Sequence, residues 1–356
     1  MCYDIHMKFL MMSDSYKGNL DSYEVGQCLK EGVLSVLPSA DVEILPMADG
    51  GEGFTECIYG VLGGTRIELE VTYPKGNKGP VFYMITKDGS TAIMEVAQPC
   101  GITLYPKQER DPLNMTTYGL GEMLLDAKSR GVKKIIVGLG GSGTNDAGMG
   151  MLEAIGNSLK DFEDIEVIAA CDVDNPLCGP HGATYVYGPQ KGVKPHQLEA
   201  LDKKLYYFSV KKGVSGDFPG AGAAGGIGYA LQAFLHAKFM SGARLLIDLY
   251  DIKNRIDRDT VMFTGEGHTD AQSASGKVVF AVGEFAKEHG LIAFCVSGYY
   301  DSDCVDVLKK HGITEVFSTA DRDVPKEESI KNARSYIKER AAKITASLQS
   351  YTHCHP

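Results

Sequence analysis

The feature that most constrains the fold is a regular alternation of short apolar runs and helix-like segments at both ends of the chain. Each apolar run is followed by a polar loop. In the segment after the first of these loops, Val25, Leu29, Val33 and Val36 recur at helical spacing. Repeated units of this kind predict a parallel sheet with helices on both faces. We therefore expect an α/β protein with a Rossmann-like three-layer α/β/α domain built from both chain ends.

The middle of the chain has a different pattern. Short predicted strands at residues 67–72, 81–86 and 91–96 are separated by PKGNKG and KDGS, which are hairpin signals. Further strands are predicted in IEVIAACDV and TYVYGPQKG, and the βα rhythm returns at RLLIDLY, which is also expected to be a strand. We therefore predict a Rossmann-like domain of residues 1–72 and 243–356, an inserted mixed α+β domain of residues 73–242, and an active site in the cleft between them.

Composition narrows the class of partner. The net charge is −10 and no long basic run occurs, so a nucleic-acid partner is not expected. No apolar stretch is long enough to span a membrane. The nine cysteines are an odd number scattered through apolar segments, which is typical of reduced thiols in a cytoplasmic protein. His353, Cys354 and His355 are potential metal ligands, but such a tail is more often a frayed chain end.

The glycine-rich stretch GLGGSG follows the apolar run 135–137 and matches the dinucleotide fingerprint G-x-G-x-x-G. The pattern is weak here, because it occurs again at Gly220, Gly222 and Gly225. The acidic residues about 20 positions further on precede the next strand, whereas a ribose-binding acid should end it. The stretch is not a Walker A loop either, since no Gly-Lys-Ser/Thr follows. The match is weak but present, so an NAD-dependent dehydrogenase stays an alternative.

The loops that follow the predicted strands share one chemistry. They combine glycines, small hydroxyls, carboxylates and lysines, which suit phosphate binding, Mg²⁺ binding and proton transfer. The structural alternative is that Ser13 and Asp21 cap helices and that ADGGEG is a tight turn. The candidate substrate- and nucleotide-binding residues are Asp14, Ser15, Gly50, Gly51, Glu52, Gly140, Gly141, Ser142, Thr144, Asn145, Asn175, Gly222, Gly265, Glu266, His268, Asp270, Ser273 and Lys277.

Taken together, these loops resemble the type I glycerate kinase family. The resemblance runs from about residue 8 to 320 and rests on the motifs SDSYKGNLDSYEV, LPMADGGEGF, TTYGLGEML, IIVGLGGSGTNDAGMGMLEAIG, ACDVDNPLCGPHGA, YGPQKG, PGAGAAGGIGYAL and TGEGHTDAQSASGKV. It implies ATP-dependent phosphorylation of D-glycerate, in this family typically to 2-phosphoglycerate, and a two-domain α/β fold. The partners it implies are glycerate and ATP with Mg²⁺, and a homodimer is left open.

The chain departs from the family pattern at several places. Gly143 stands where the family usually has Ala, so the dinucleotide pattern is an accident of that substitution. A longer segment common between LEAIGNSLK and IEVIAACDV is missing, and VAQPCG replaces a run of small residues ending in Ser-Gly. His268 stands where the family often has Arg. A mostly neutral imidazole replaces a fixed bidentate donor there, which puts the substrate preference in doubt.

The catalytic candidates are Asp49, Asp146, Asp172 and Lys17. We expect Lys17 or Lys277 to contact phosphoryl oxygens or the glycerate carboxylate. One of the three aspartates is expected to be the base or an indirect Mg²⁺ ligand, with Glu52, Glu266 and Asp270 as further candidates. Residues 140–142 are expected to present N–H groups at a helix start. No metal-ligand set is assigned, and the choice between the 2- and 3-phosphoglycerate products stays open. Two further alternatives are a kinase for another small sugar acid and a sugar-acid-binding regulator.

Overall fold

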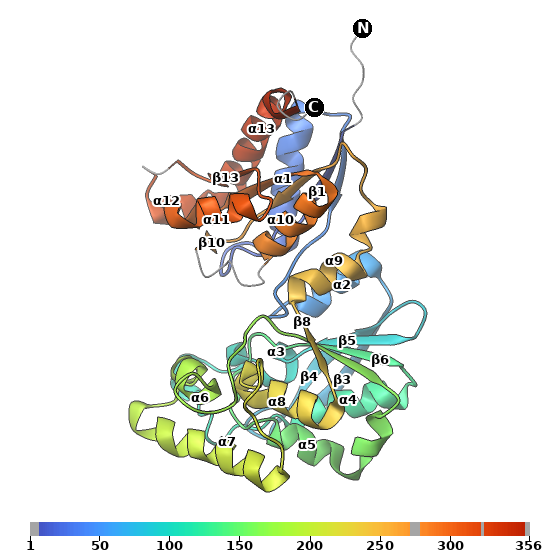
Figure 1. The fold of residues 1–356 in the computed structure, drawn as a ribbon, viewed down its shortest axis with the longest axis vertical. Coiled ribbons are helices and arrows are strands. Elements are labelled where there is room, and N and C mark those ends of the chain that lie inside the picture. The colour runs from blue at the N-terminus through green and yellow to red at the C-terminus, as the bar shows by residue number, and fades with distance from the viewer. Residues whose placement is uncertain (1–6, 271–277, 322–323, 353–356) are drawn as a thin grey trace. The chain divides into compact units, whose positions relative to one another are not determined.

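The computed structural model describes residues 7–270, 278–321 and 324–352, and it divides the chain into two units (Figure 1). The first unit comprises Met1–Ala48 and Ala243–Pro356, and the second comprises Asp49–Gly242. The sequence had suggested a first boundary after residue 72. In the structure this boundary lies after Ala48, before α2 (Phe54–Leu62). The reason is that β3 (Thr65–Thr72) pairs along its whole length with β4 (Lys78–Ile85) in the second unit.

The first unit contains a five-stranded parallel sheet formed by both chain ends, which confirms that prediction. Its strands lie in the order β13-β11-β9-β1-β2. The chain order reverses between β1 and β9, and such a switch point is where open α/β sheets bind ligands. The strands are β1 (Lys8–Met11), β2 (Asp41–Ile44), β9 (Val261–Thr264), β11 (Ile292–Ser297) and β13 (Glu315–Ser318).

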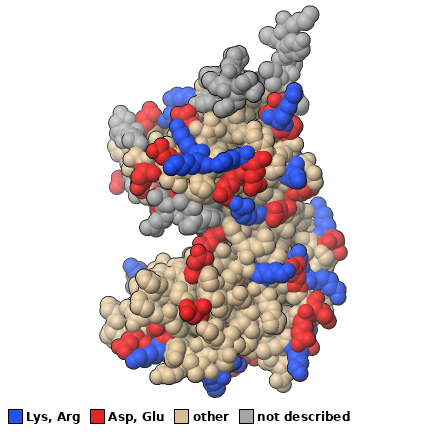
Figure 2. All heavy atoms as spheres, in the orientation of Figure 1, with Lys and Arg blue, Asp and Glu red and all other residues tan. Residues whose placement is uncertain are grey.

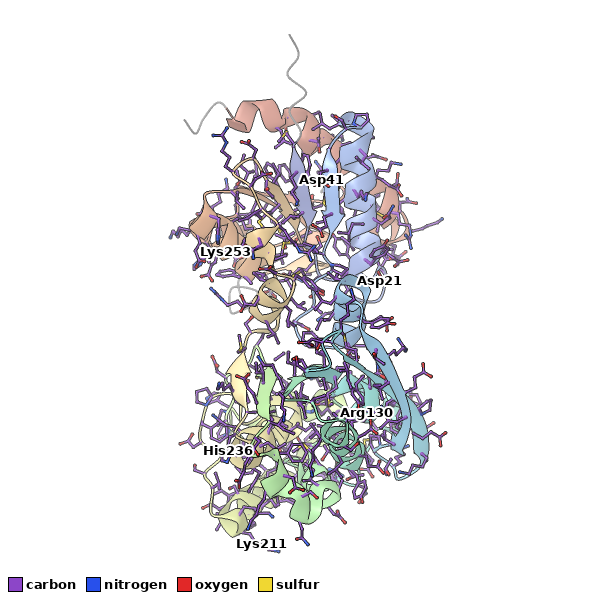
Figure 3. All side chains as sticks on the ribbon, turned by 90° about the vertical axis from the view of Figure 1, so that its right-hand side faces the viewer. Asp21, Asp41, Arg130, Lys211, His236 and Lys253 are labelled. Carbon is purple, nitrogen blue, oxygen red and sulfur yellow. The ribbon has the colours of Figure 1, made fainter. Side chains whose placement is uncertain are left out.

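The first and last helices of the chain cover one face of this sheet. The helix α1 (Ser22–Val36) packs against α13 (Ala333–Thr352), and both share a core with Phe9 and Met11 of β1 (Figure 1). Gly32 lies at the helix contact, where a Cβ would be 2.4 Å from the Lys338 carbonyl oxygen. Asp21, labelled in Figure 3, caps α1, because its Oδ1 accepts a hydrogen bond of 2.7 Å from the Glu24 N–H. The alternative that Asp21 serves as a helix cap is therefore confirmed.

The other elements of the first unit complete its third layer. The helix α10 (Val278–His289) packs on β9 and β11. The segment RLLIDLY is not a strand but lies in α9 (Gly242–Leu249) and the residue after it, with Leu245, Leu246 and Tyr250 buried and Arg244 and Asp248 on the polar side. The remaining elements are β10 (His268–Thr269), β12 (Tyr299–Tyr300), α11 (Val305–Lys310) and α12 (Lys326–Lys331).

The second unit is the expected mixed α+β domain. Its six-stranded sheet has the order β3-β4-β5-β6-β7-β8, with β3, β4 and β5 antiparallel and β5 to β8 parallel. TYVYGPQKG, expected to be a strand, forms a short helix and a 3-10 turn. The remaining elements are β5 (Thr91–Glu95), β6 (Lys134–Gly138), β7 (Glu166–Ala170), β8 (Lys238–Met240), α3 (Ala97–Cys100), α4 (Tyr118–Ser129), α5 (Met149–Ile155), α6 (Ala183–Tyr187), α7 (Leu198–Lys212) and α8 (Ala223–Leu235).

The molecular surface carries both signs of charge. On the face shown in Figure 2, basic side chains are interspersed with acidic ones. No helix within the described ranges is long and apolar enough to cross a membrane.

Candidate active site

Two glycine-rich loops of the second unit touch backbone to backbone. Residues 49–53 form the loop before α2, and residues 138–142 comprise the last residue of β6 and the loop that follows it. The Gly140 N–H donates a hydrogen bond of 2.9 Å to the Gly50 carbonyl oxygen. A Cβ on Gly140 would lie 2.4 Å from the Gly51 Cα, and one on Gly138 would lie 2.6 Å from the Gly50 oxygen. Any side chain at either position would therefore force the two loops apart.

This contact explains the dinucleotide pattern. Gly138 and Gly140 face the backbone of the neighbouring loop, and the third glycine, Gly143, faces residues 101–102, with a Cβ only 3.1 Å from the Gly101 oxygen. In a dinucleotide site the second glycine lets the pyrophosphate approach the backbone. Here the protein itself occupies that side, so the fingerprint gives no support to the dehydrogenase alternative.

The loop after β6 is longer than the sequence suggested. The helix α5 begins at Met149, after Gly148 in a left-handed conformation, so residues 140–142 do not lie at a helix start. That expectation was wrong because the loop first folds against α3, where the Gly143 N–H donates to the Cys100 oxygen at 2.7 Å. No acceptor for the N–H groups of Gly141 and Ser142 occurs among the residues that the structure describes. Gly141 is exposed and Ser142 is buried, and both N–H groups are candidate donors to a ligand.

Asp146 is buried and fully engaged in structural hydrogen bonds. Its Oδ2 accepts from the Thr117 N–H at 3.0 Å, the Thr117 hydroxyl at 2.9 Å and the Gly150 N–H at 3.1 Å, and its Oδ1 accepts from the Gly148 N–H at 3.0 Å. Burial raises the pKa of Asp146, and the hydrogen bonds offset part of that effect. The carboxylate fixes the starts of α4 and α5, and this geometry does not favour it as the base.

Asp49 and Asp172 lie on neighbouring loops. The Asp49 Oδ1 accepts from the Gly51 N–H at 3.1 Å. A Cβ on Gly50 would be 3.0 Å from the oxygen of Ala170, the last residue of β7, and Asp172 follows in the next loop. Both carboxylate oxygens of Asp172 are buried. These two loops therefore bring two of the predicted aspartates to the same edge of the sheet.

Glu95, which the sequence motifs did not single out, supports the Asp49 loop. It ends β5, is 2 % exposed, and accepts from the N–H groups of Gly53 at 3.1 Å and Thr55 at 2.8 Å. It therefore caps α2, whose own N-cap residue is a glycine. Burial raises the pKa of Glu95. The signal in the sequence that could have identified Glu95 is its position as a lone acidic residue at the end of an apolar run.

Lys191 was also missed. It is 2 % exposed, and its ammonium donates to the Ser142 hydroxyl at 2.7 Å and the Thr144 carbonyl oxygen at 2.8 Å. It lies within TYVYGPQKG, which was predicted to be strand-like, and within the motif YGPQKG, which contributed to the resemblance without a residue role.

Other predicted binding residues shape the loops around them. The Asn145 Nδ2 donates to the Thr184 hydroxyl at 2.9 Å. The Asn175 Nδ2 donates to the His181 oxygen at 2.8 Å, and its Oδ1 accepts from the Tyr187 hydroxyl at 2.6 Å. The Gly222 N–H donates to the Asn175 oxygen at 2.8 Å. Thr144 is buried within the same loop, whereas Glu52 is exposed.

The first unit gathers its own candidates at the carboxyl ends of its strands. The Asp14 N–H donates to the Gly265 oxygen at 2.9 Å, which joins the loops after β1 and β9, and the Ser15 N–H donates to the Asp14 Oδ1 at 2.6 Å. Glu266 accepts from the Thr269 hydroxyl at 3.2 Å. Lys17 is exposed and Asp270 is partly exposed. Ser273 and Lys277 lie outside the described residues.

His268 is an exposed residue of this group. Its Nε2 lies 3.3 Å from the Asp301 Oδ1, and its ring packs at 5.3 Å from that of Tyr299. The short β10–β12 pair fixes this arrangement.

Comparison with known proteins identifies the family. The model of the Glycerate kinase family matches residues 9–164 and 159–349. The chain belongs to the glycerate kinase family. It is 34% identical to the glycerate kinase of Bacillus subtilis (strain 168), over 96% of this chain and 98% of that protein. It is 36% identical to the glycerate 2-kinase of Escherichia coli (strain K12), with the same coverage.

A solved structure agrees with this assignment. The crystal structure of a protein assigned as glycerate kinase 2 of Salmonella typhimurium LT2 matches with a TM-score of 0.80 and 33% identity, over 98% of this chain and 99% of that one. The resemblance read from the sequence motifs is therefore confirmed, and the protein is a phosphotransferase of the glycerate kinase family.

Mg²⁺ was expected from the sequence as the ion that accompanies ATP. Within the described ranges, no group of three or more His, Cys, Asp or Glu side chains could hold an ion by itself. Mg²⁺ in kinases is held largely by substrate phosphates and by one or two carboxylates. Asp49 and Asp172 could supply those.

Proposed function

We propose that this protein transfers the terminal phosphoryl group of ATP to the 2-hydroxyl of D-glycerate and forms 2-phosphoglycerate. The observation that carries the proposal is the nearly full-length similarity to proteins named glycerate kinase, one of them a glycerate 2-kinase. The glycine-rich loop of the second unit supports it, because the N–H groups of Gly141 and Ser142, which have no acceptor among the described residues, suit phosphoryl or carboxylate oxygens.

Phosphoryl transfer depends on positioning and on neutralisation of charge. The Gly141 and Ser142 N–H groups are proposed to orient the anionic part of a substrate, and Lys17 to neutralise charge on phosphate. Asp49 or Asp172 is proposed to accept the proton of the attacking hydroxyl. Bound Mg²⁺ would neutralise charge on the nucleotide phosphates, with the other of these two carboxylates as its candidate ligand.

The experiment that tests the function is an ADP-release assay with D-glycerate, followed by identification of the product. We expect ATP-dependent ADP release and 2-phosphoglycerate. Formation of 3-phosphoglycerate would refute the regiochemistry alone. An absence of ADP release with D-glycerate would refute the proposal that D-glycerate is the substrate. The same assay with other small hydroxy acids would then show whether the protein is a kinase for another sugar acid.

The choice of base is tested by comparing Asp49→Asn, Asp172→Asn and Asp146→Asn. Substitution of the base should lower kcat by about 10²–10⁴-fold with substrate binding largely kept. We expect this result for Asp49 or Asp172. Asp146→Asn should act mainly through stability, because its oxygens hold α4 and α5. Near wild-type kcat in both Asp49→Asn and Asp172→Asn would exclude the proposed roles.

His268 supports the second candidate, a kinase with a shifted acid preference. Its imidazole already faces Asp301 and offers no fixed bidentate donor. If the position reads the substrate carboxylate, His268→Arg should lower the KM for D-glycerate relative to longer sugar acids. An unchanged ranking of acids in His268→Arg would remove His268 from substrate selection.

A further inference from the structure

Lys191 places a buried amine directly behind the loop that presents the free N–H groups. Its ammonium donates to the side chain of Ser142 and to the main chain of Thr144. The next residue of the loop, Asn145, is held by Thr184, and Lys191 and Thr184 come from the same short segment, 183–191. This segment therefore holds residues 142–145 through side-chain hydrogen bonds, in addition to the Gly50–Gly51 contact of Gly140.

An amine at this place is costly for the folded protein. Lys191 is almost fully buried, and an ammonium taken out of water needs compensation. Burial lowers the pKa of Lys191 to about 7. Two titratable groups face Lys191: Asp146, from the loop before α5, and Cys100, from α3. Both raise the pKa of Lys191 and so offset part of the effect of burial. The protonated amine has three N–H donors and the described residues accept two of them, whereas the neutral amine has only two N–H groups.

We propose that Lys191 is a positioning residue of the kinase. It holds the 142–145 loop in place, and its amine becomes more fully protonated when an anion binds at the loop. The inference rests on the proposed function, and in particular on an anion-binding role for Gly141 and Ser142. Lys191 touches the loop, not the substrate, so its effect on the reaction passes through the loop geometry and through its field.

The charge coupling has a measurable consequence. An anion bound at the loop favours the protonated amine and raises the pKa of Lys191. Near pH 8 the free protein holds Lys191 mostly neutral, so binding should draw a proton from solution. The anion could be the carboxylate of glycerate or the phosphates of ATP. Both ligands are fully ionised at this pH and do not themselves take up the proton.

The test is isothermal titration of the full-length protein at pH 8, in two buffers of different ionisation enthalpy. Glycerate and ATP with Mg²⁺ are titrated separately. We expect uptake approaching about one proton per ligand in at least one arm. Lys191→Met should abolish this uptake. Lys204→Met, the same substitution at an exposed lysine of α7, should leave it unchanged.

Kinetics separate positioning from simple loss of fold. In Lys191→Met we expect kcat/KM to fall on the order of a hundredfold, carried mainly by kcat if the loop is misplaced in the transition state. The wild-type pH profile should have a limb near pH 7 that is missing in the variant. If Lys191→Met does not fold, Ser142→Ala removes one acceptor and keeps the amine. It should retain proton uptake but lower kcat/KM.

Three results would overturn the inference. The first is an absence of proton uptake by the wild-type protein in both arms. The second is equal uptake in Lys191→Met, and the third is a change of less than about threefold in its kcat/KM. Failure of the proposed function is seen separately, because the wild-type protein would then release no ADP with D-glycerate. In that case the ATP arm would still report on Lys191.

Discussion

The backbone contact between Gly140 and Gly51 depends on the absence of a single methyl group. A Cβ at Gly140 would lie 2.4 Å from the Gly51 Cα and 2.8 Å from its nitrogen, and none of these atoms belongs to a flexible side chain. We predict that Gly140→Ala lowers the free energy of unfolding by about 1–3 kcal/mol and raises KM for substrate, because the loops must separate. Urea unfolding and steady-state kinetics measure both effects.

Gly143→Ala is the matched control. The same methyl group would stand 3.1 Å from its nearest neighbours at Gly101 and Ile102, a contact that small shifts can relieve. Gly143→Ala should therefore cost clearly less unfolding free energy than Gly140→Ala, because the neighbouring backbone has to move by only a few tenths of an ångström. Equal losses in the two variants would contradict the proposed packing of the glycine loops.

Asp146 is predicted to be a structural residue. In Asp146→Asn one oxygen becomes an NH₂ group that meets N–H donors, so we expect a loss of about 3 kcal/mol in unfolding free energy. Asp49→Asn serves as the comparison and should lose less unfolding free energy, because Asp49 is only partly buried and its bond to the Gly51 N–H lies within its own loop. Circular dichroism during chemical denaturation distinguishes them, and a fully stable Asp146→Asn would refute the structural role.

Lys191 predicts a pH dependence of stability. Its pKa is about 7 in the folded protein and lies below the ordinary value of 10.5. The unfolded chain therefore binds more protons between these values, so stability rises with pH in this window. The difference in unfolding free energy between wild type and Lys191→Met should grow by up to about 1.4 kcal/mol per pH unit from pH 7 to 9. A pH-independent difference would show that Lys191 is not buried as described.

At the residue scale the sequence predicted the loops better than the individual roles. Glycines, aspartates and the Ser142 region could be assigned because they follow apolar runs whose strands end at one edge. Glu95 and Lys191 could not, since their importance comes from burial against loops that are distant in sequence. Asp146 had the right chemistry for a base, and only its hydrogen bonds show that both oxygens are engaged.

At the element scale, the close contact between α1 and α13 is a determinant of the stability of the first unit. Gly32 lies in the middle of α1, where Ala would ordinarily stabilise a helix. A Cβ there would lie 2.4 Å from the Lys338 oxygen and 2.6 Å from the Ala341 Cβ. We therefore predict that Gly32→Ala destabilises the protein by about 1–3 kcal/mol.

Gly60 in α2 gives the opposite case. It is exposed, and a Cβ added there would have no neighbour within 4 Å, so Gly60→Ala should stabilise by about 0.5–1 kcal/mol. Thermal unfolding of the pair tests the helix contact. A gain in stability for Gly32→Ala would mean that α1 and α13 are further apart than the structure shows.

At the element scale, the long periodic segments and most short apolar runs were predicted correctly, but two short apolar runs were not. The helix 22–37 was evident from its spacing, and the structure has α1 at Ser22–Val36. RLLIDLY and TYVYGPQKG are short and rich in apolar residues, so periodicity alone does not separate a strand from a buried helix. Both proved helical, because each packs one side on a core and turns the other to solvent.

At the scale of the whole molecule, the second unit is one continuous segment whose ends meet. A Cβ on Gly242 would lie 2.7 Å from the carbonyl carbon of Asp49, and the unit has a core of its own. We predict that residues 49–242 expressed alone fold cooperatively, as shown by circular dichroism and a single unfolding transition. A fragment of residues 73–242, which lacks α2 and β3, is the control and should fail, since β4 loses its partner strand.

The packing of α1 on α13 also sets the order in which the protein can form during synthesis. Residues 8–44 leave the ribosome before the inserted unit, whereas α13, which covers their face of the sheet together with α1, is made only after it. The inserted unit leaves the ribosome whole in the meantime, and domains generally fold as they emerge. Phe9 and Met11 can therefore pack against α1 early, but the part of their core that α13 supplies is added only after the inserted unit and the other strands of the sheet have been made.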